Sequence, residues 1–268
     1  MSDEFLSTLR LSSSTPLEDA DKGGRVICPI CKKSMKYFCY NCRKSLLPNA
    51  PQMTLPIKLD IVHHPTEKTS KSTALTACVL APQDATWVEF PDEIPEYDSN
   101  ETLLLFPSED AKKLSEIPDL KKYKRVVCIE SVWDKANAVK CHKNLVNLPK
   151  AVICAESTLF WRYQHLSDAN LSTIEAIYYF YRDYYLATIG NYTGQCDDLL
   201  YYFVHIYKKV QGFYNQHPEK SFAHKDGYIK YTDKIVENEK KEEEKRKREE
   251  KVFQIEKKKD KKMIPKNN

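Results

Sequence analysis

Short apolar runs, separated by polar segments, recur along the chain between residues 57 and 214. They are β-branched or leucine-rich, as expected for a sheet covered on both faces, and they lie at 57–62, 76–80, 102–106, 125–129 and 151–154. Helical segments are predicted between and after these runs, at 109–114, 132–141, 172–187 and 197–214. The pattern predicts an α/β domain with a largely buried sheet.

The segments on either side of this domain differ from it in composition. Residues 1–24 are rich in serine and acidic residues, which predicts a disordered N-terminus. Residues 25–47 contain four cysteines, and residues 48–56 contain three prolines, which predict a stiff linker. The α/β domain follows over residues 57–214, and a charged tail, helical or disordered, spans residues 215–268.

The net positive charge of the chain lies near its end. Residues 234–268 carry 14 Lys+Arg and 9 Asp+Glu, so the chain totals of 42 and 38 leave 28 and 29 for the rest. Glutamates four residues before a cation, such as Glu242 before Arg246, indicate a solvated helix in part of the tail. The tail is interpreted as a solubilising appendage, or as a nucleic-acid contact or nuclear-import signal.

Glycine is too sparse for the common nucleotide-binding loops. The chain has 6 glycines, and none lies between Arg25 and Ile189. Phosphate-binding loops need glycines where the backbone meets phosphate, which excludes ordinary P-loop NTPases and argues against glycine-rich dehydrogenases and methyltransferases. Neither a membrane span of about 20 apolar residues nor a secretory signal is visible, so we expect an intracellular protein without a membrane partner.

Two CxxC pairs stand close together in the N-terminal part of the chain. Cys28 and Cys31 form the first pair, and Cys39 and Cys42 form the second. Two such pairs can close a tetrahedral Zn²⁺ site, and four protein ligands make the zinc structural. The alternative is a set of unrelated buried or redox cysteines. Nearby cations would offset the thiolate charge: Lys32, Lys33, Lys36, Arg43 and Lys44.

Polar and aromatic segments follow several of the predicted strands. Ligands of open α/β sheets bind beyond the carboxyl ends of the strands. Ser172 and Glu175 form a capping-box pattern, which predicts a helix N-terminus that can hold a carboxylate. Each segment alone is also explained as a turn, a cap or a packing tryptophan. The segments are Phe106-Pro107-Ser108, Glu130-Ser131-Val132-Trp133, Phe160-Trp161-Arg162 and Leu171-Ser172-Thr173.

Taken together, these motifs resemble the DTW-domain family, the tRNA-uridine aminocarboxypropyltransferases. The resemblance covers residues 28–210 and includes the cysteine pairs and the following segments: Leu55-Pro56-Ile57-Lys58-Leu59-Asp60-Ile61, His64-Pro65-x-Glu67, Lys71-Ser72-Thr73-Ala74, Ile94-Pro95-Glu96-Tyr97, Leu105-Phe106-Pro107, Phe160-Trp161-Arg162 and the stretch from Leu171 to Phe180. It implies a SPOUT-like α/β fold with a C-terminal knot. It also implies S-adenosylmethionine as the donor of a 3-amino-3-carboxypropyl group to N3 of a tRNA D-loop uridine, at position 20.

The sequence departs from the family at its signature, Asp-x-Thr-Trp directly after a buried strand. The matching segment here is Glu130-Ser131-Val132-Trp133, which keeps a carboxylate and the tryptophan but lacks the threonine hydroxyl. A literal Asp84-Ala85-Thr86-Trp87 also occurs, but it follows Ala81-Pro82 rather than a predicted strand. We therefore interpret the first segment as the signature and the second as a decoy.

The resemblance assigns expected roles to the residues of these segments. Glu130 is expected to be the catalytic base or to orient it, because uridine N3 must lose its proton. Arg162 is expected to contact the donor carboxylate or a tRNA phosphate, His64 to have a structural or tRNA-contact role, and Glu175 to cap a helix. Trp133 either packs on the adenine or fills the core. The expected donor-binding residues are Phe106, Pro107, Ser108, Ser131, Trp133, Leu171, Ser172 and Thr173.

Tyrosines occupy all sides of the predicted helix 172–187, at positions 178, 179, 181, 184 and 185. A buried helix interface with hydroxyls at its rim is one interpretation, and stacking on splayed bases is the other.

Two other functions compete with the transferase. One is a zinc-containing RNA-binding protein whose transferase site has decayed, which the altered signature and basic tail favour. The other is a SPOUT-type RNA methyltransferase, which would use the same donor. We expect the protein in the nucleus, with the cytoplasm as the alternative.

Overall fold

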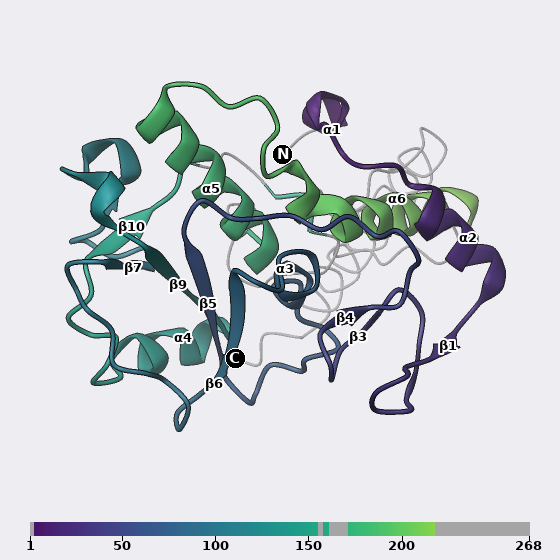
Figure 1. The fold of residues 1–268 in the computed structure, drawn as a ribbon, viewed down its shortest axis with the longest axis horizontal. Helices are drawn as coiled ribbons and strands as arrows, with labels where there is room; N and C mark the ends of the chain where they lie inside the picture. Colours follow the sequence, from purple (N-terminus) through teal and green to yellow (C-terminus); the bar gives the residue numbers. More distant parts are fainter. Residues whose placement is uncertain (1–2, 155–157, 161–170, 218–268) are drawn as a thin grey trace, which may run out of the picture. The chain divides into compact units, whose positions relative to one another are not determined.

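A parallel sheet lies at the centre of the chain (Figure 1). The computed structural model describes residues 3–154, 158–160 and 171–217. Within this part, six strands pair in the order β6-β5-β9-β7-β10-β8, and every pairing is parallel. The carboxyl ends of neighbouring strands therefore lie at the same edge. The strands are β5 (Lys58–His63), β6 (Ala85–Glu89), β7 (Thr102–Leu105), β8 (Lys112–Lys113), β9 (Arg125–Glu130) and β10 (Lys150–Val152).

The central strands coincide with apolar runs of the sequence. All four residues of β7 are buried, and so are Ile61 and Val62 of β5 and Val126 and Val127 of β9. Burial on both faces explains why these runs are continuous rather than alternating. The prediction of a mixed α/β fold with a largely buried sheet is confirmed.

The run 76–80 was expected to be a strand, and the structure corrects this. It forms the helix α3 (Leu75–Leu80), in which every residue is buried. The Ser72 hydroxyl accepts a hydrogen bond from the N–H of Leu75 at 3.3 Å, which caps the start of the helix. Because α3 is buried on all sides, its short apolar run has no helical periodicity that distinguishes it from a strand.

Three of the four predicted helical segments are present, and one is not. The helix expected at 109–114 is replaced by a turn, by strand β8 and by the 3-10 turn η1 (Leu114–Glu116), because this segment pairs with β10. Pairing with a distant strand here overrides the local pattern. No helix of the described residues is long and apolar enough to cross a membrane. The remaining helical elements are η2 (Leu120–Lys122), α4 (Trp133–Lys140), α5 (Thr173–Ile189), η3 (Asp197–Leu200) and α6 (Tyr201–Gln216).

The tyrosines of α5 support the interpretation as a buried helix interface. Tyr178, Tyr179, Tyr181 and Tyr184 are all buried, and Tyr185 is half-buried. The hydroxyl of Tyr181 reaches the sheet, where it donates to the carbonyl of Ile57 at 3.0 Å. The aromatic face of α5 therefore holds the helix on the sheet.

Residues 3–24 differ from the disorder that their composition predicts. They form α1 (Asp3–Thr8) and α2 (Thr15–Gly23), and Leu17 of α2 is fully buried. Between the helices, the N–H of Arg10 donates to Asp197 at 2.6 Å, and Ser12 donates to Asp198 through its N–H and its hydroxyl. The order comes from carboxylates far along the chain, which composition does not reveal.

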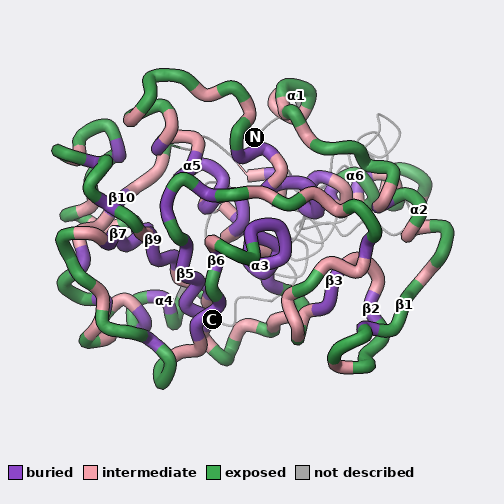
Figure 2. Tube along the Cα trace, viewed as in Figure 1, coloured by how far each residue is buried: buried purple, intermediate pink, exposed green. Residues whose placement is uncertain are grey.

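The four-cysteine segment folds as two small hairpins. β1 (Val26–Ile27) pairs with β2 (Ser34–Met35), and β3 (Phe38–Cys39) pairs with β4 (Lys44–Ser45), both antiparallel. Cys28 and Cys39 are buried between them, whereas the tip around β1 is exposed (Figure 2). The described residues up to Phe160 and from Leu171 to Tyr207 form one compact unit, so the hairpins and the sheet belong together.

Candidate active site and metal centre

The carboxyl ends of β5 and β9 bring two predicted segments side by side. In the register of this pair, His63 lies opposite Glu130. The N–H of His64 donates to the carbonyl of Glu130 at 2.9 Å, which extends the pairing one residue past the strand. The histidine segment and the altered signature therefore meet at one edge of the sheet, where α/β proteins bind ligands.

Glu130 is a buried acid at this edge. Its side chain is only 4% exposed, and the hydroxyls of Ser72 and Thr173 hydrogen-bond to the carboxylate. Burial raises the pKa of Glu130 above its usual range, while the two hydroxyls and the nearby His63 oppose this shift. A carboxyl group with a raised pKa is suited to accept a proton near neutral pH.

The starts of two helices position the hydroxyls around Glu130. Ser72 caps α3, and Thr173 is the first residue of α5. The hydroxyl of Thr73 accepts the N–H of Ile174 at 3.3 Å, which ties the two helix starts together. The motifs of the sequence include the segment from Lys71 to Ala74 but predict no role for Ser72. The position of this segment shortly after His64-Pro65-x-Glu67 is the one feature of the sequence that points to Ser72 as a site residue.

His63 is held by acceptors on both ring nitrogens. Its Nδ1 lies 2.7 Å from Oε2 of Glu89, and its Nε2 lies 2.8 Å from the carbonyl oxygen of Glu67. The ring also packs against Trp87, at 4.7 Å between centroids, and Trp87 donates to Glu89. Although burial opposes it, hydrogen bonds from His63 and Trp87 lower the pKa of Glu89, which keeps that carboxylate ionised. His63 is buried and Glu89 is partly exposed, and this pair lies beside Glu130.

His64 lies at the same edge but has different contacts. Its ring stacks on Phe90 at 5.1 Å, and its Nδ1 lies 2.8 Å from the hydroxyl of Thr66. Burial lowers the pKa of His64, with a further contribution from nearby Lys135. The side chain is half-buried, and its contact with substrate stays a prediction.

Glu175 caps α5, as the sequence predicts, and it also anchors a loop. Its carboxylate accepts the N–H and the hydroxyl of Ser172, at 2.8 and 2.7 Å. It also accepts the Thr158 hydroxyl at 2.7 Å and the Leu159 N–H at 2.8 Å. Glu175 thus fixes the segment that leads to Trp161 and Arg162, which lie outside the described residues. The Ser172 hydroxyl is buried and bound within this cap, so contact with a donor would have to compete with Glu175.

Residues 106–108 follow β7 at the same edge. Phe106 packs in the main hydrophobic core, with the Lys140 ammonium 4.9 Å from the ring centroid. Pro107 is exposed, and the hydroxyl of Ser108 donates to Asp110 at 2.7 Å. Phe106 is therefore foremost a core residue, and a donor contact of these three residues stays a prediction.

Three further donor-binding predictions fall on residues around β9 and α5. The hydroxyl of Ser131 donates to the carbonyl of Val132 at 3.1 Å, and Leu171 is half-buried before the capping residue. Trp133 begins α4, but its side chain lies outside the part that the structure describes. Their donor contacts also stay predictions.

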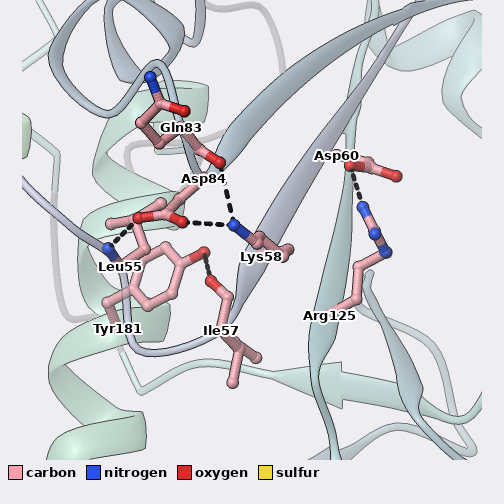
Figure 3. A network of polar contacts seen from close by, with 8 residues as sticks. All are labelled: Leu55, Ile57, Lys58, Asp60, Gln83, Asp84, Arg125 and Tyr181. Atoms are coloured by element: carbon pink, nitrogen blue, oxygen red, sulfur yellow. Dashed lines mark hydrogen bonds and ion pairs between the residues drawn. The ribbon is translucent and has the colours of Figure 1, made fainter.

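Asp84, the first residue of the literal Asp84-x-Thr-Trp sequence, lies beside Leu55 and Lys58 at the amino ends of β5 and β6 (Figure 3). Asp84 immediately precedes β6, where its carboxylate accepts the Leu55 N–H at 2.9 Å and pairs with Lys58 at 2.7 Å. Although burial opposes it, these partners lower the pKa of Asp84. Asp84 is thus a structural anchor, which supports its interpretation as a decoy. The segment itself enters a strand, which the sequence did not predict.

The four predicted metal ligands converge on one point. The sulfur atoms of Cys28, Cys31, Cys39 and Cys42 all lie within 4.8 Å of one another. After each pair the backbone turns through a positive φ, 60° at Lys32 and 52° at the corresponding arginine. These tight turns aim each pair of sulfurs inward, so the donor set fits a single tetrahedral ion.

The local backbone also suits bound thiolate. The N–H of Cys42 points to the sulfur of Cys39 at 3.4 Å. The N–H groups of Cys31 and Ile30 lower the pKa of Cys28 to about 6, whereas burial raises the pKa of Cys42 to about 12. A divalent cation among the sulfurs would favour the ionised form of all four.

A parallel sheet with a buried carboxylate at its carboxyl edge, in one unit with four cysteines that could hold a metal ion, defines the class: an α/β protein with a candidate metal-binding module. Residues 27–211 of the chain match the DTW domain. The chain belongs to the DTW-domain family.

Several relatives share most of their length with this chain. The tRNA-uridine aminocarboxypropyltransferase 1 of Xenopus tropicalis is 32% identical, over 78% of this chain and 87% of the relative. The proteins of the same name from Mus musculus and Homo sapiens are 32% and 30% identical, over 78% of this chain and 85% of each relative. No solved structure matches the chain.

Proposed function

We propose that this protein transfers the 3-amino-3-carboxypropyl group of S-adenosylmethionine to N3 of a uridine in the D-loop of tRNA, at position 20. The observation that carries the proposal is Glu130, buried at the ligand-binding edge and held by the hydroxyls of Ser72 and Thr173. The names of the relatives, at about a third identity over most of the chain, support the same reaction.

Glu130 serves as the base in this proposal. Its carboxylate takes the proton from uridine N3, and the nitrogen electron pair forms a bond to the carbon of the donor chain that is attached to sulfur. That carbon–sulfur bond breaks, and its electrons stay on sulfur in methylthioadenosine. The donor supplies a good leaving group, so positioning and proton removal are the main tasks of the protein.

The neighbours of Glu130 tune and hold this base. Ser72 and Thr173 orient the carboxylate, and their hydrogen bonds prevent burial from raising its pKa still further. His63, fixed by Glu89 and the carbonyl of Glu67, places a partly compensating positive charge nearby when it is protonated. Because these hydroxyls come from other segments, the carboxylate has polar partners although Val132 replaces the threonine of the signature.

The remaining residues of the edge are assigned to binding. The segments 106–108, 131–133 and 171–173 bind the donor, while His64 and Arg162 face the tRNA in this proposal. Zn²⁺ held by the four cysteines is structural, because four protein ligands leave no open position for substrate.

The polypeptide path around this edge is proposed to follow the SPOUT type, with a knot formed by the C-terminal part of the domain. The parallel pairing of all strands in the sheet is compatible with that path.

The decisive experiment uses bulk tRNA and two donor preparations, one labelled in the methyl group and one in the carboxypropyl chain. We expect label in tRNA only from the carboxypropyl donor, and loss of that transfer in a folded Glu130→Gln variant. Label from the methyl donor alone would replace the proposal with a methyltransferase. No label from either, with zinc bound and the fold intact, would favour the RNA-binding protein with a decayed site.

A further inference from the structure

The predicted metal module, residues 25–47, has more positive than negative side chains. It contains six cations and no acidic residue: Arg25, Lys32, Lys33, Lys36, Arg43 and Lys44. Four thiolates with one Zn²⁺ have a net charge of about −2, by the ordinary charges of these ions. The cations therefore exceed what the metal centre needs for neutrality, and the module as a whole is positive.

The module also exposes apolar side chains beside these cations. Ile27 and Ile30 are 61% and 62% exposed, and Val26 of the same hairpin is exposed as well. Lys32 and Lys33 follow Cys31 in the turn of this hairpin, and both are exposed. Large β-branched residues on a small metal-stabilised hairpin form a contact surface rather than part of its core, which consists of Cys28, Met35 and Cys39.

Other contacts fix the module firmly to the body of the protein. Asp21 of α2 binds the hydroxyl of Tyr37, pairs with Lys36 at 2.8 Å, and lies 3.0 Å from His205 of α6. Arg43 also lies close enough to Glu89 to lower its pKa. The module is therefore held in a defined position on the body of the protein, with β4 next to α3 (Figure 1).

We propose that the exposed tip of the module, formed by Arg25, Val26, Ile27, Ile30, Lys32 and Lys33, docks the tRNA substrate. The cations contact backbone phosphates, and Ile27 and Ile30 pack on unstacked bases outside the target uridine. Excess positive charge matches a polyanion, whereas a protein partner for the apolar pair alone would not need it. This inference rests on the proposed function. Its consequence is that a rigid second contact selects which uridine reaches Glu130.

The test compares paired charge reversals in the full-length protein. Lys32→Glu with Lys33→Glu alters the tip, while Lys121→Glu with Lys122→Glu makes the same charge change within η2, before the amino end of β9. Binding of tRNA is measured at several salt concentrations, together with zinc content, thermal unfolding, kcat and KM. For the tip variant we expect at least tenfold weaker binding, a salt slope smaller by about two, and kcat within about twofold. The control is expected to change binding by less than threefold.

A second pair separates the apolar contact from charge. Ile27→Ser with Ile30→Ser is expected to weaken tRNA binding about tenfold without changing the salt slope. Unchanged affinity in both tip variants, with zinc retained, would overturn the proposal, and unchanged affinity in the isoleucine variant alone would overturn the contact of Ile27 and Ile30 with bases.

Binding of tRNA can be measured without catalysis, so a failure of the docking proposal can be distinguished from a failure of the proposed function. Repeating the titration in the Glu130→Gln background keeps the docking test valid even if no transfer is detected. Transfer without any dependence of KM on the tip would instead leave the proposed function standing and overturn the docking.

Discussion

Glu130 and Asp84 each stand three residues before a tryptophan, and their surroundings give them different tasks. Glu130 ends a central strand at the carboxyl edge of the sheet, among hydroxyls and beside a buried histidine. Asp84 precedes an outer strand at the other end, where it binds a backbone N–H and a lysine. A carboxylate with backbone and lysine partners stabilises structure, whereas one with a raised pKa at a ligand edge is suited to proton transfer.

A pair of isosteric amides tests this assignment. Glu130→Gln is expected to lower kcat by about 10³-fold, because the base is lost. Asp84→Asn is expected to preserve kcat but to destabilise the fold by about 1–3 kcal/mol, because the Leu55 N–H and Lys58 lose a charged acceptor. Transfer assays and urea unfolding measure both effects. The reverse outcome, with activity lost only on changing Asp84, would contradict the choice of signature.

The pH profile should respond to the hydroxyls around Glu130. Ser72 and Thr173 stabilise its ionised form, so Ser72→Ala or Thr173→Val raises the pKa of Glu130 further. The acidic limb of the kcat/KM profile is then expected to move to higher pH by about one unit. Thr173→Ser keeps the hydroxyl and should leave the limb in place. A limb that moves in the serine variant, or in none, would exclude Glu130 as the titrating base.

The same buried acid has a consequence for stability. Because the folded pKa of Glu130 is raised above its unfolded value, its contribution is favourable below that unfolded value and is lost as pH rises. Glu130→Gln is therefore expected to be at least as stable as the unmodified protein at pH 8, and comparatively less so at pH 5. Thermal unfolding at the two pH values measures this difference, and a variant that is less stable at pH 8 than at pH 5, relative to the unmodified protein, would contradict it.

At the scale of the elements, one buried carboxylate of η3, that of Asp197, holds the N-terminal segment in place. Asp197 accepts hydrogen bonds from the N–H of Arg10 and from the hydroxyls of Tyr178 and Tyr192. Gly194 makes room for it, because a Cβ at that position would lie 2.9 Å from its Oδ2. The neighbouring Asp198 binds Ser12 in an exposed position.

This difference gives a matched comparison of two adjacent aspartates. Asp197→Ala is expected to destabilise the protein by about 2–4 kcal/mol, since three donors, among them the buried hydroxyl of Tyr178, lose a buried acceptor. Asp198→Ala is expected to cost less than about 1 kcal/mol, because its partners regain water. Urea unfolding gives both values, and hydrogen exchange at residues 10–20 reports whether the segment loosens. Equal losses in the two variants would show that burial of Asp197 does not matter.

In the whole molecule, the metal module is built into the same compact unit as the sheet. Removing the metal is therefore expected to affect more than the hairpins, because Asp21, Tyr37 and His205 share one network. Cys39→Ser or chelation should lower the melting temperature by about 5 °C or more and weaken tRNA binding. Metal analysis with calorimetry checks this. A melting temperature unchanged on complete metal loss would contradict a structural role.

The sequence predicts those parts of the fold in which local pattern and final environment agree. Strands β5, β7 and β9 are buried on both faces, so their continuous apolar runs identify them. The sequence does not predict the helix α3, because α3 is buried on all sides. It does not predict the order of residues 3–24, because carboxylates far along the chain hold them.

The candidate site is likewise predictable from the sequence only where a local pattern specifies it. The position of Glu130 follows from a strand and the loop after it, and the cap of Glu175 follows from spacing alone. The His63–Glu89 pair depends on β6, β5 and β9 being neighbours in that order, which no local pattern specifies.

Glu175 joins two structural tasks in a single carboxylate. It closes the first turn of α5 through Ser172, and it binds the loop residues 158–159, which precede the segment that contains Arg162. A substitution of Glu175 would remove both sets of hydrogen bonds, so neither structural role can change separately during evolution. We therefore expect Thr158, Ser172 and Glu175 to covary among homologues as a set, with the loop and the helix inherited together.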